Sequence, residues 1–173
     1  HIDFNDKDAL FIYDIITRVE QRENERRSHK SQIGKIQKLK EAQKSNKSVY
    51  LGGSALFGYK NENKEWKLNK DEVKWVKWIF NAYENGKSTK DIKNHLDKEG
   101  VATRRTKSGL WNMVTIQKML ANKTYTGIHS VKVRKLGGRV FSFKVPKIIT
   151  VSQFNNVQKK LFANQRMKDN NKQ

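Results

Sequence analysis

The chain has 173 residues, which is room for one domain or for one small domain with an extension. Its 37 Lys and Arg against 17 Asp and Glu give a net charge of +20 at pH 7, so the expected partner is a polyanion, with nucleic acid first and an anionic membrane surface second. The lack of cysteine excludes disulfides, a cysteine-ligated zinc ribbon and thiol chemistry, and no apolar run approaches the ~20 residues of a membrane span.

The N-terminal residues show no signal-peptide pattern, because Asp3, Asp6, Lys7 and Asp8 interrupt it. Together with the absence of cysteine, this predicts a protein of a reducing cytoplasm that has no membrane partner. The four histidines have no ligand spacing and the acidic residues are scattered, so the sequence predicts no metal site and no cofactor.

Residues 8–45 are expected to form one long helix of ~55 Å, because the segment has no proline and only one glycine, Gly34. Its first half is apolar nearly all round, which is typical of a helix packed on a partner. The second half is rich in lysine and arginine. Two interpretations of this basic half stay open, namely a solvated helix face and a helix that runs over a DNA backbone.

Residues 46–54 have the composition of a loop and are expected to form a linker, in which Gly52 and Gly53 allow backbone conformations that other residues avoid. After it, Asn69 is expected to cap a second helix, with Glu72 completing a capping box, and Gly86 ends this helix. A third helix is expected after Ser88, whose cap is completed by an aspartate three residues later.

A basic loop, residues 103–110, follows the third helix. It holds three cations, two threonines and a serine within eight residues, and it precedes a helix that Asn112 would cap. Arginines, hydroxyl groups and helix N-termini are all suited to phosphate contacts, and arginines also bind guanine edges. A solvated loop is the alternative, but the net charge favours contact with DNA.

The fourth helix is expected over residues 113–121. Its apolar spacing predicts a buried face made of Met113, Ile116, Met119 and Leu120. The opposite side would carry Val114, Thr115 and Lys118, which could face a groove of DNA.

Beyond this helix the period of the pattern changes. Residues 125–134 alternate as in a β-strand, Gly137 and Gly138 favour a turn, and residues 140–144 return, which predicts one β-hairpin. Thr150 is expected to cap a last helix, and the residues after Asn164 are polar. The sequence thus predicts a mainly α fold of the α+β type, with a long N-terminal helix over 1–45, a linker over 46–54, a small helical DNA-binding domain over 55–163 and a polar tail over 164–173.

Several short motifs occur in order along the chain: Gly58-Tyr59, Ile79-Phe80, Gly86, Ser88 with Ile92, Trp111 with Val114, Leu120 with Asn122, and Tyr125 with Gly127. This ordered set resembles the recombinase domain of large serine recombinases, the phage integrases, transposases and cassette recombinases of bacteria. Asn112 stands where serine is usual in that family, and asparagine also caps a helix. Residues 16–31 are similar to the end of the helix that joins the catalytic domain to this one.

The resemblance implies a parent enzyme that cuts two DNA sites with a serine nucleophile, exchanges strands within a tetramer and rejoins them, so that a mobile element is integrated or excised. The nucleophile motif and the cysteine-rich second DNA-binding module of the family do not occur in these residues. The chain is therefore interpreted as an internal fragment of such an enzyme, with no catalytic residue of its own. No energy cofactor is implied, because the phosphodiester energy is held in the covalent link.

The resemblance also implies roles for residues. Double-stranded attachment-site DNA is the implied partner, in a bacterial or phage-encoded, nucleoid-associated protein that forms dimers and a synaptic tetramer at full length. The basic helix and linker would follow the DNA backbone and a minor groove, and the basic loop with the fourth helix would reach the major groove. The residues implied in DNA binding are Arg26, Arg27, Lys30, Lys47, Tyr50, Gly52, Gly53, Arg104, Arg105, Thr106, Lys107, Ser108, Asn112, Thr115 and Lys118. The contact with the catalytic domain or a partner subunit would use Leu10, Phe11, Tyr13 and Ile16.

Other functions remain open at this point. A helix-turn-helix regulator with a long dimerisation helix explains the charge and the helices between Ser88 and Leu120 equally well, but it explains the glycine linker and the hairpin less well. An RNA-associated basic protein is disfavoured by the lack of an exposed aromatic pair on a strand. A stand-alone nuclease is disfavoured because the carboxylates form no metal-ligand pattern.

Overall fold

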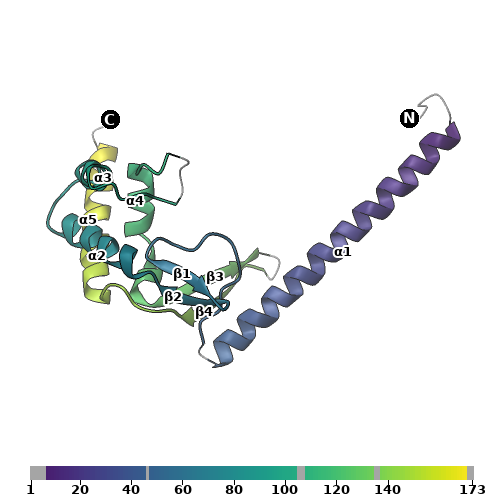
Figure 1. The fold of residues 1–173 in the computed structure, drawn as a ribbon, viewed down its shortest axis with the longest axis horizontal. Helices are drawn as coiled ribbons and strands as arrows, with labels where there is room; N and C mark the ends of the chain where they lie inside the picture. Colours follow the sequence, from purple (N-terminus) through teal and green to yellow (C-terminus); the bar gives the residue numbers. More distant parts are fainter. Residues whose placement is uncertain (1–6, 46, 105–107, 135–136, 171–173) are drawn as a thin grey trace. The chain divides into compact units, whose positions relative to one another are not determined.

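The computed structural model describes residues 7–45, 47–104, 108–134 and 137–170, with side chains described only from residue 8 to residue 164 within these ranges. The chain divides into two compact units, His1–Glu41 and Ala42–Gln173. Figure 1 labels the helices and strands in sequence order. No helix in the described part of the chain is long and apolar enough to cross a membrane.

The long helix predicted from the sequence is confirmed as α1, Lys7–Ser45, whose 39 residues correspond to a length of about 58 Å. The first unit consists of this helix up to Glu41 among the described residues. Within the helix, Asp14 and Arg18 form an i,i+4 ion pair at 2.9 Å between Oδ2 and Nε. Such an exposed pair adds only a few tenths of a kcal/mol to helix stability.

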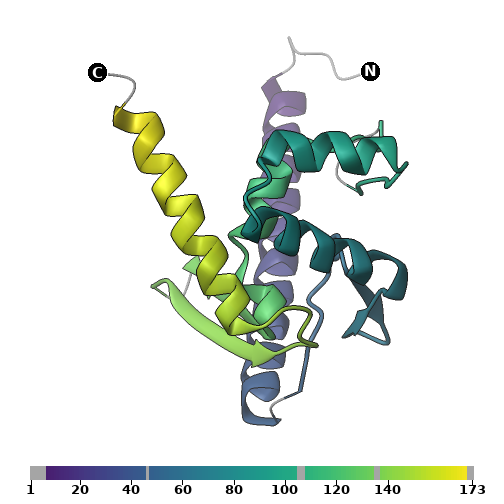
Figure 2. The same cartoon turned by 90° about the vertical axis from the view of Figure 1, so that its left-hand side faces the viewer.

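The second unit holds the remaining helices and two antiparallel hairpins (Figures 1 and 2). Its helices are α2 (Lys70–Glu84), α3 (Thr89–Lys98), α4 (Met113–Leu120), the 3-10 helix η1 (Lys123–Thr126) and α5 (Val151–Asn170). Its strands are β1 (Tyr59–Glu62), β2 (Glu65–Leu68), β3 (Ile128–Val133) and β4 (Arg139–Lys144). The predicted fold class, mainly α of the α+β type, is confirmed, but there are two hairpins where the sequence predicted one.

The unpredicted hairpin pairs β1 with β2, in a register that places Tyr59 opposite Leu68. Its turn is made by Asn63 and Lys64, which both have positive φ angles of 51° and 61°. Two such residues give the turn geometry whose twist matches paired strands. Lysine is unusual in that conformation, so the sequence carried only a weak indication of this turn.

The predicted hairpin is confirmed as β3 and β4, with Ile128 opposite Lys144. Its first strand begins later than predicted, because Asn122 caps η1 by accepting a hydrogen bond from the Thr124 amide at 3.0 Å. The 3-10 helix ends at Gly127, whose φ is +100°. Tyr125 therefore belongs to η1 and is buried in the core, where only 1% of its surface is exposed.

The core of the second unit forms where α2 and α4 pack on α3 and α5, and where η1 packs on α5 and β3. Tyr59 and Tyr125 stack with ring centroids 5.8 Å apart, and Phe80 meets the Tyr125 ring edge-on. The Tyr59 hydroxyl donates to the Pro146 carbonyl at 2.8 Å, and burial raises the pKa of this hydroxyl well above its usual range. These buried rings hold β1 against η1.

Helix caps follow the sequence closely. Asn69 and Asn112 cap α2 and α4, Ser88 and Asp91 form the full capping box of α3, and Thr150 accepts from the Gln153 amide at 3.1 Å. The capping box predicted for α2 is wrong in one part, because the Asn69 amide donates to the Gly58 carbonyl and the Glu72 side chain binds elsewhere. The last helix continues to Asn170, into the segment predicted as a polar tail.

Candidate nucleic-acid interface

The joint between α3 and α4 is held by Asp97 and Trp111. The Asp97 carboxylate accepts from the Trp111 amide at 2.9 Å and from Lys93 at 2.8 Å. These two bonds, the one from Lys93 first, lower the pKa of Asp97, so the carboxylate stays ionised at neutral pH. The Trp111 indole is buried and donates to the Val101 carbonyl at 2.7 Å, and its ring meets Phe57 edge-on at 5.0 Å. This joint fixes where α4 begins.

The basic loop starts and ends on this joint. The Thr103 amide donates to the Gly109 carbonyl at 2.8 Å, which brings the two ends of the loop together. Gly109 has a φ of +70°, a conformation that favours glycine. Ser108 is exposed, whereas Arg105, Thr106 and Lys107 lie outside the described residues.

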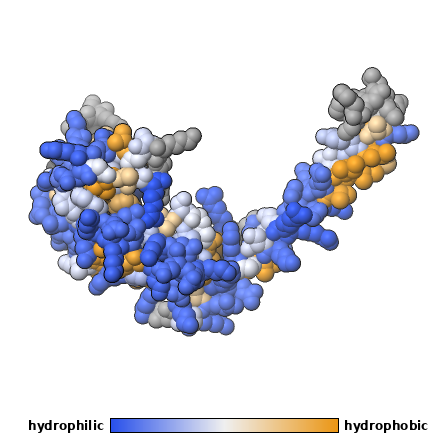
Figure 3. Space-filling model, viewed as in Figure 1, coloured by the Kyte–Doolittle hydropathy of each residue, from blue (hydrophilic) through white to orange (hydrophobic). Residues whose placement is uncertain are grey.

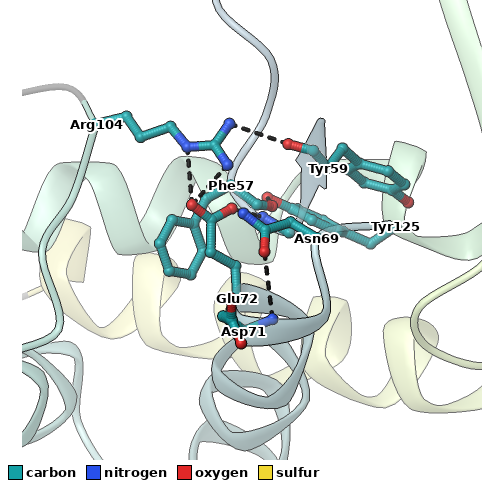
Figure 4. A network of polar contacts seen from close by, with 8 residues as sticks. Phe57, Tyr59, Asn69, Asp71, Glu72, Arg104 and Tyr125 are labelled. Atoms are coloured by element: carbon teal, nitrogen blue, oxygen red, sulfur yellow. Dashed lines mark hydrogen bonds and ion pairs between the residues drawn. The ribbon is translucent and has the colours of Figure 1, made fainter. Parts of the chain in front are cut away.

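Arg104 is placed differently from a free loop cation (Figure 4). Its Nε and Nη2 atoms lie 2.8 and 2.6 Å from Oε1 of Glu72, and its Nη1 donates to the Tyr59 carbonyl at 3.0 Å. The other carboxylate oxygen of Glu72 accepts from the Gly58 amide at 2.7 Å. The Glu72 side chain is 16% exposed and that of Arg104 34%. Arg104 thus ties the start of the basic loop to α2 and β1.

Glu72 is a residue whose importance the sequence analysis missed. The sequence predicted that it would cap its own helix, but its carboxylate joins three segments that are far apart in the chain: the glycine before β1, the start of α2 and the basic loop. The only indication in the sequence is that Glu72 and Asp71 are two acidic residues in the first turn of a helix. That pattern alone does not distinguish a local cap from a distant ion pair.

α4 presents one buried and one exposed side. Ile116, Met119 and Leu120 are buried as predicted, but the prediction for Met113 is wrong, since 46% of its surface is exposed. Met113 is the first residue of the helix, before the turn at which α4 begins to pack on the core, so helical spacing overestimated its burial. On the other side Lys118 is exposed and Thr115 is half-buried.

Asn112 uses its side-chain oxygen as the cap of α4. Its Oδ1 accepts from the amides of Val114 and Thr115, at 2.7 and 3.3 Å. Asn112 is exposed, as are Ser108 and Leu110, which come shortly before it in the chain. The end of the basic loop and the start of α4 are therefore neighbouring exposed segments of the chain.

The linker is attached to the first hairpin. The Tyr50 amide donates to the Lys64 carbonyl at 2.8 Å, and the Trp66 indole donates to the Val49 carbonyl at 3.0 Å. The Tyr50 ring packs edge-on against Trp66 at 5.4 Å, and its hydroxyl donates to the Gly53 carbonyl at 2.5 Å. Gly52 and Gly53 are exposed with φ angles of +98° and +88°, and Lys47 is exposed. Backbone conformation, rather than crowding, requires glycine here, since a side-chain carbon added at either glycine would meet no described atom within 4 Å.

The remaining predicted residues lie on α1, in the other unit. Arg26, Arg27 and Lys30 are all exposed, and Arg27 forms an ion pair with Glu23. Near the start of the same helix the large apolar side chains are exposed, by 39% for Leu10 and 66% for Phe11. Figure 3 shows them as an apolar patch on an otherwise polar helix. The patch comprises Leu10, Phe11, Ile12, Tyr13, Ile15, Ile16 and Val19.

No group of three or more His, Asp or Glu side chains with the geometry of a metal site occurs in the described part of the chain. The chemistry that this surface offers is that of hydrogen-bond donors and positive charge. Such groups bind anions and hold a polymer in register.

Two solved structures are similar to this chain in fold. A crystal structure of an LSR–DNA complex aligns with 73% of this chain and 37% of its own, at a TM-score of 0.55 and 21% identity. A structure concerned with the sequence requirements of the Listeria innocua prophage attP site aligns with 75% of this chain and 49% of its own, at a TM-score of 0.52 and 21% identity. The chain therefore spans less than half the length of either protein.

The family comparison agrees with the ordered motifs. The model of the Recombinase family matches residues 70–164, more than half of the chain, and this range contains α2 to α4, the second hairpin and most of α5. The resemblance to large serine recombinases, predicted from the motifs between Gly58 and Gly127, is confirmed. The chain belongs to the Recombinase family.

Proposed function

We propose that this chain is the DNA-binding part of a serine site-specific recombinase and that it recognises attachment-site duplex DNA. The observation that carries the proposal is the exposed region made by the end of the basic loop and the start of α4, held in place by Asp97 and by Glu72. This region contains a capped helix whose outer side is available to a groove of DNA. The net charge of +20 of the whole chain supports binding to DNA. Residues 55–163 form the proposed recognition domain.

Within this proposal the side chains divide by their surroundings. Ser108, Thr115 and Lys118, with the side-chain amide of Asn112, approach the major groove, together with the loop residues Arg105, Thr106 and Lys107. Arg104 is a positioning residue in this scheme, because its guanidinium already binds Glu72 and Tyr59. This differs from its implied role as a direct DNA contact.

The linker and the basic half of α1 are proposed to follow the sugar–phosphate backbone. Lys47 supplies charge, and Gly52 and Gly53 leave the backbone open for close approach to a minor groove. Tyr50 holds the linker on the first hairpin through Trp66. On α1, the proposed contacts are Arg26, Arg27 and Lys30, all of them exposed.

The apolar patch on α1 is proposed as a protein contact. Seven large apolar side chains on one exposed helix segment are more than a solvated helix normally carries. Their occupant is proposed to be the catalytic domain or a second subunit, so that Leu10, Phe11, Tyr13 and Ile16 take part in the dimer and synaptic tetramer of the full-length recombinase. A regulator with a dimerisation helix is not favoured, since the family match spans the helices and the second hairpin.

The test is selection from a random duplex pool by the 173-residue chain, followed by salt-dependent binding to the selected and unselected duplexes. The proposal expects one enriched half-site, bound ~10³-fold or more tightly than random duplex. Uniform affinity that falls steeply with salt would reduce the chain to a general polyanion binder and refute the recognition part.

A further inference from the structure

The second hairpin has an open face that no proposed DNA contact uses. Because side chains alternate along a strand, Ser130 and Lys132 of β3 lie on the same face as Ser142 and Lys144 of β4, and all four are exposed. The two serine hydroxyls lie 2.9 Å apart in the centre of this face. Its opposite face carries the buried Phe141 and Phe143. We call the exposed face, with Lys132, Lys144 and the serine pair, the ribbon face.

The charge of the ribbon face is not balanced inside the protein. Among the described residues no carboxylate lies within ion-pair distance of Lys132 or Lys144. In the first hairpin, by contrast, the two strand lysines are paired, Lys60 with Glu62 at 3.1 Å and Lys67 with Glu65 at 3.3 Å. The difference is encoded in the sequence. Residues 100–168 contain fifteen Lys and Arg and no Asp or Glu. An uncompensated surface of this kind attracts a polyanion.

The spacing of the two lysines suits a duplex. Lys144 lies opposite Ile128, four residues along β3 from Lys132, so the two backbone positions are about 13 Å apart along the ribbon. This is close to the ~12 Å width of the major groove between its two phosphate rows. One of the two serine hydroxyls donates to the other, and the hydroxyl that accepts in this pair can donate to a phosphate oxygen.

The second hairpin, through its covered side, packs on the same residue as the proposed linker contact. On the covered side of the hairpin, His129 packs against Trp66 with ring centroids 4.8 Å apart. Trp66 in turn packs against Tyr50 of the linker at 5.4 Å. A duplex that the linker follows would therefore pass beside the second hairpin, which is held to the same support.

We propose that the ribbon face is a second DNA-contact surface, on which Lys132 and Lys144 each bind a backbone phosphate of the attachment-site duplex. The inference rests on the proposed function and extends it to residues outside the linker, the basic loop and α4. Its contribution is to affinity and register, because phosphate contacts carry no direct sequence information.

The experiment compares two variants of the 173-residue chain that lose the same charge. One is Lys132→Gln with Lys144→Gln, on the ribbon face. The matched control is Lys74→Gln with Lys77→Gln, two exposed lysines of α2 that lie outside every proposed contact. Because all four side chains are exposed, the thermal unfolding midpoints of both variants should stay close to that of the parent chain.

The readout is the slope of log K against log salt on a selected duplex. Losing two phosphate contacts reduces the magnitude of this slope by about 2, and the ribbon variant is expected to show that loss while the control keeps a slope within about 0.5 of the parent. Phosphate ethylation should cease to interfere with ribbon-variant binding at two positions where it blocks the parent. Equal slopes for the two variants would overturn the inference about the ribbon face.

The parent chain separates this failure from that of the proposed function. If the parent selects one half-site and the ribbon variant keeps the parental slope, only the ribbon-face inference fails. If the parent selects no sequence but the ribbon variant still loses about 2 in slope, the phosphate contacts stand and recognition of an attachment site fails. If the parent does not bind duplex DNA at all, both fail.

Discussion

Replacement of Arg104 by alanine tests whether this residue supports the fold or contacts DNA. The substitution removes two donors from Glu72 Oε1, at 2.8 and 2.6 Å, and one from the Tyr59 carbonyl at 3.0 Å. It leaves a carboxylate that is 16% exposed with the Gly58 amide as its remaining partner among the contacts that the structure shows.

The magnitude follows from these contacts. Removing one partner of a fully buried pair costs about 3–5 kcal/mol. Water can reach this pair, because 34% of the Arg104 side chain is exposed. The expected loss in the free energy of unfolding is therefore smaller, about 2–3 kcal/mol. Arg104→Lys keeps the charge but loses the planar guanidinium group. Its free energy of unfolding should therefore lie between those of Arg104→Ala and the parent chain.

The assay is urea unfolding followed by tryptophan fluorescence. All four tryptophans lie in the second unit, so the signal reports that unit alone. In a double-mutant cycle with Glu72→Gln, a coupling energy of about 1 kcal/mol or more is expected between the two residues. A loss below about 0.5 kcal/mol in Arg104→Ala, accompanied by weaker DNA binding, would refute this reasoning and make Arg104 a direct DNA contact.

Three further substitutions test the supports of the site. Gly58→Ala should lower the free energy of unfolding by at least about 2 kcal/mol, because the new carbon would lie 2.8 Å from a Val76 methyl at a φ of +94°. Gly86→Ala should lower it less, because Gly86 has a similar φ of +90° but no atom within 4 Å of the new carbon. Thermal unfolding measures both losses. Asn112→Ala should destabilise the fold by about 1 kcal/mol in urea, whereas Asn112→Ser should restore most of the cap, and equal losses would contradict the capping role. Burial lowers the pKa of His129, so below the ordinary histidine pKa of ~6.5 the unfolded chain binds a proton that the folded chain refuses. Stability should therefore fall as the pH is lowered from about 7.5 to about 5.5, and this dependence should be weaker in His129→Gln; unchanged pH dependence would count against it.

The helices and their caps could be predicted because their causes are local. Asn69, Ser88 and Asn112 each bind amides two or three residues ahead, and a short stretch of sequence contains both partners. The long helix was predictable for the same reason, since no residue within it breaks the backbone pattern.

What the sequence did not reveal depends on distant partners. The first hairpin has strands of four residues, too short to show a period, and it is stabilised by Trp66 packing on Tyr59 and on the linker. The partners of Glu72 lie fourteen residues before it and thirty-two residues after it. Nothing in the sequence marks Arg104 as the partner of Glu72, because only the fold brings these two residues together.

The residues that carry the family resemblance are largely those that build the core. Tyr59, Trp111 and Tyr125 are at most 2% exposed, and Gly58 is in contact with the side chains that surround it. These buried residues determine how the basic loop and α4 are held. Side chains that could contact a duplex must instead be exposed. Under the proposed function, fold and target sequence are therefore governed by separate sets of side chains, so the exposed set can change the DNA site selected without any change in the core.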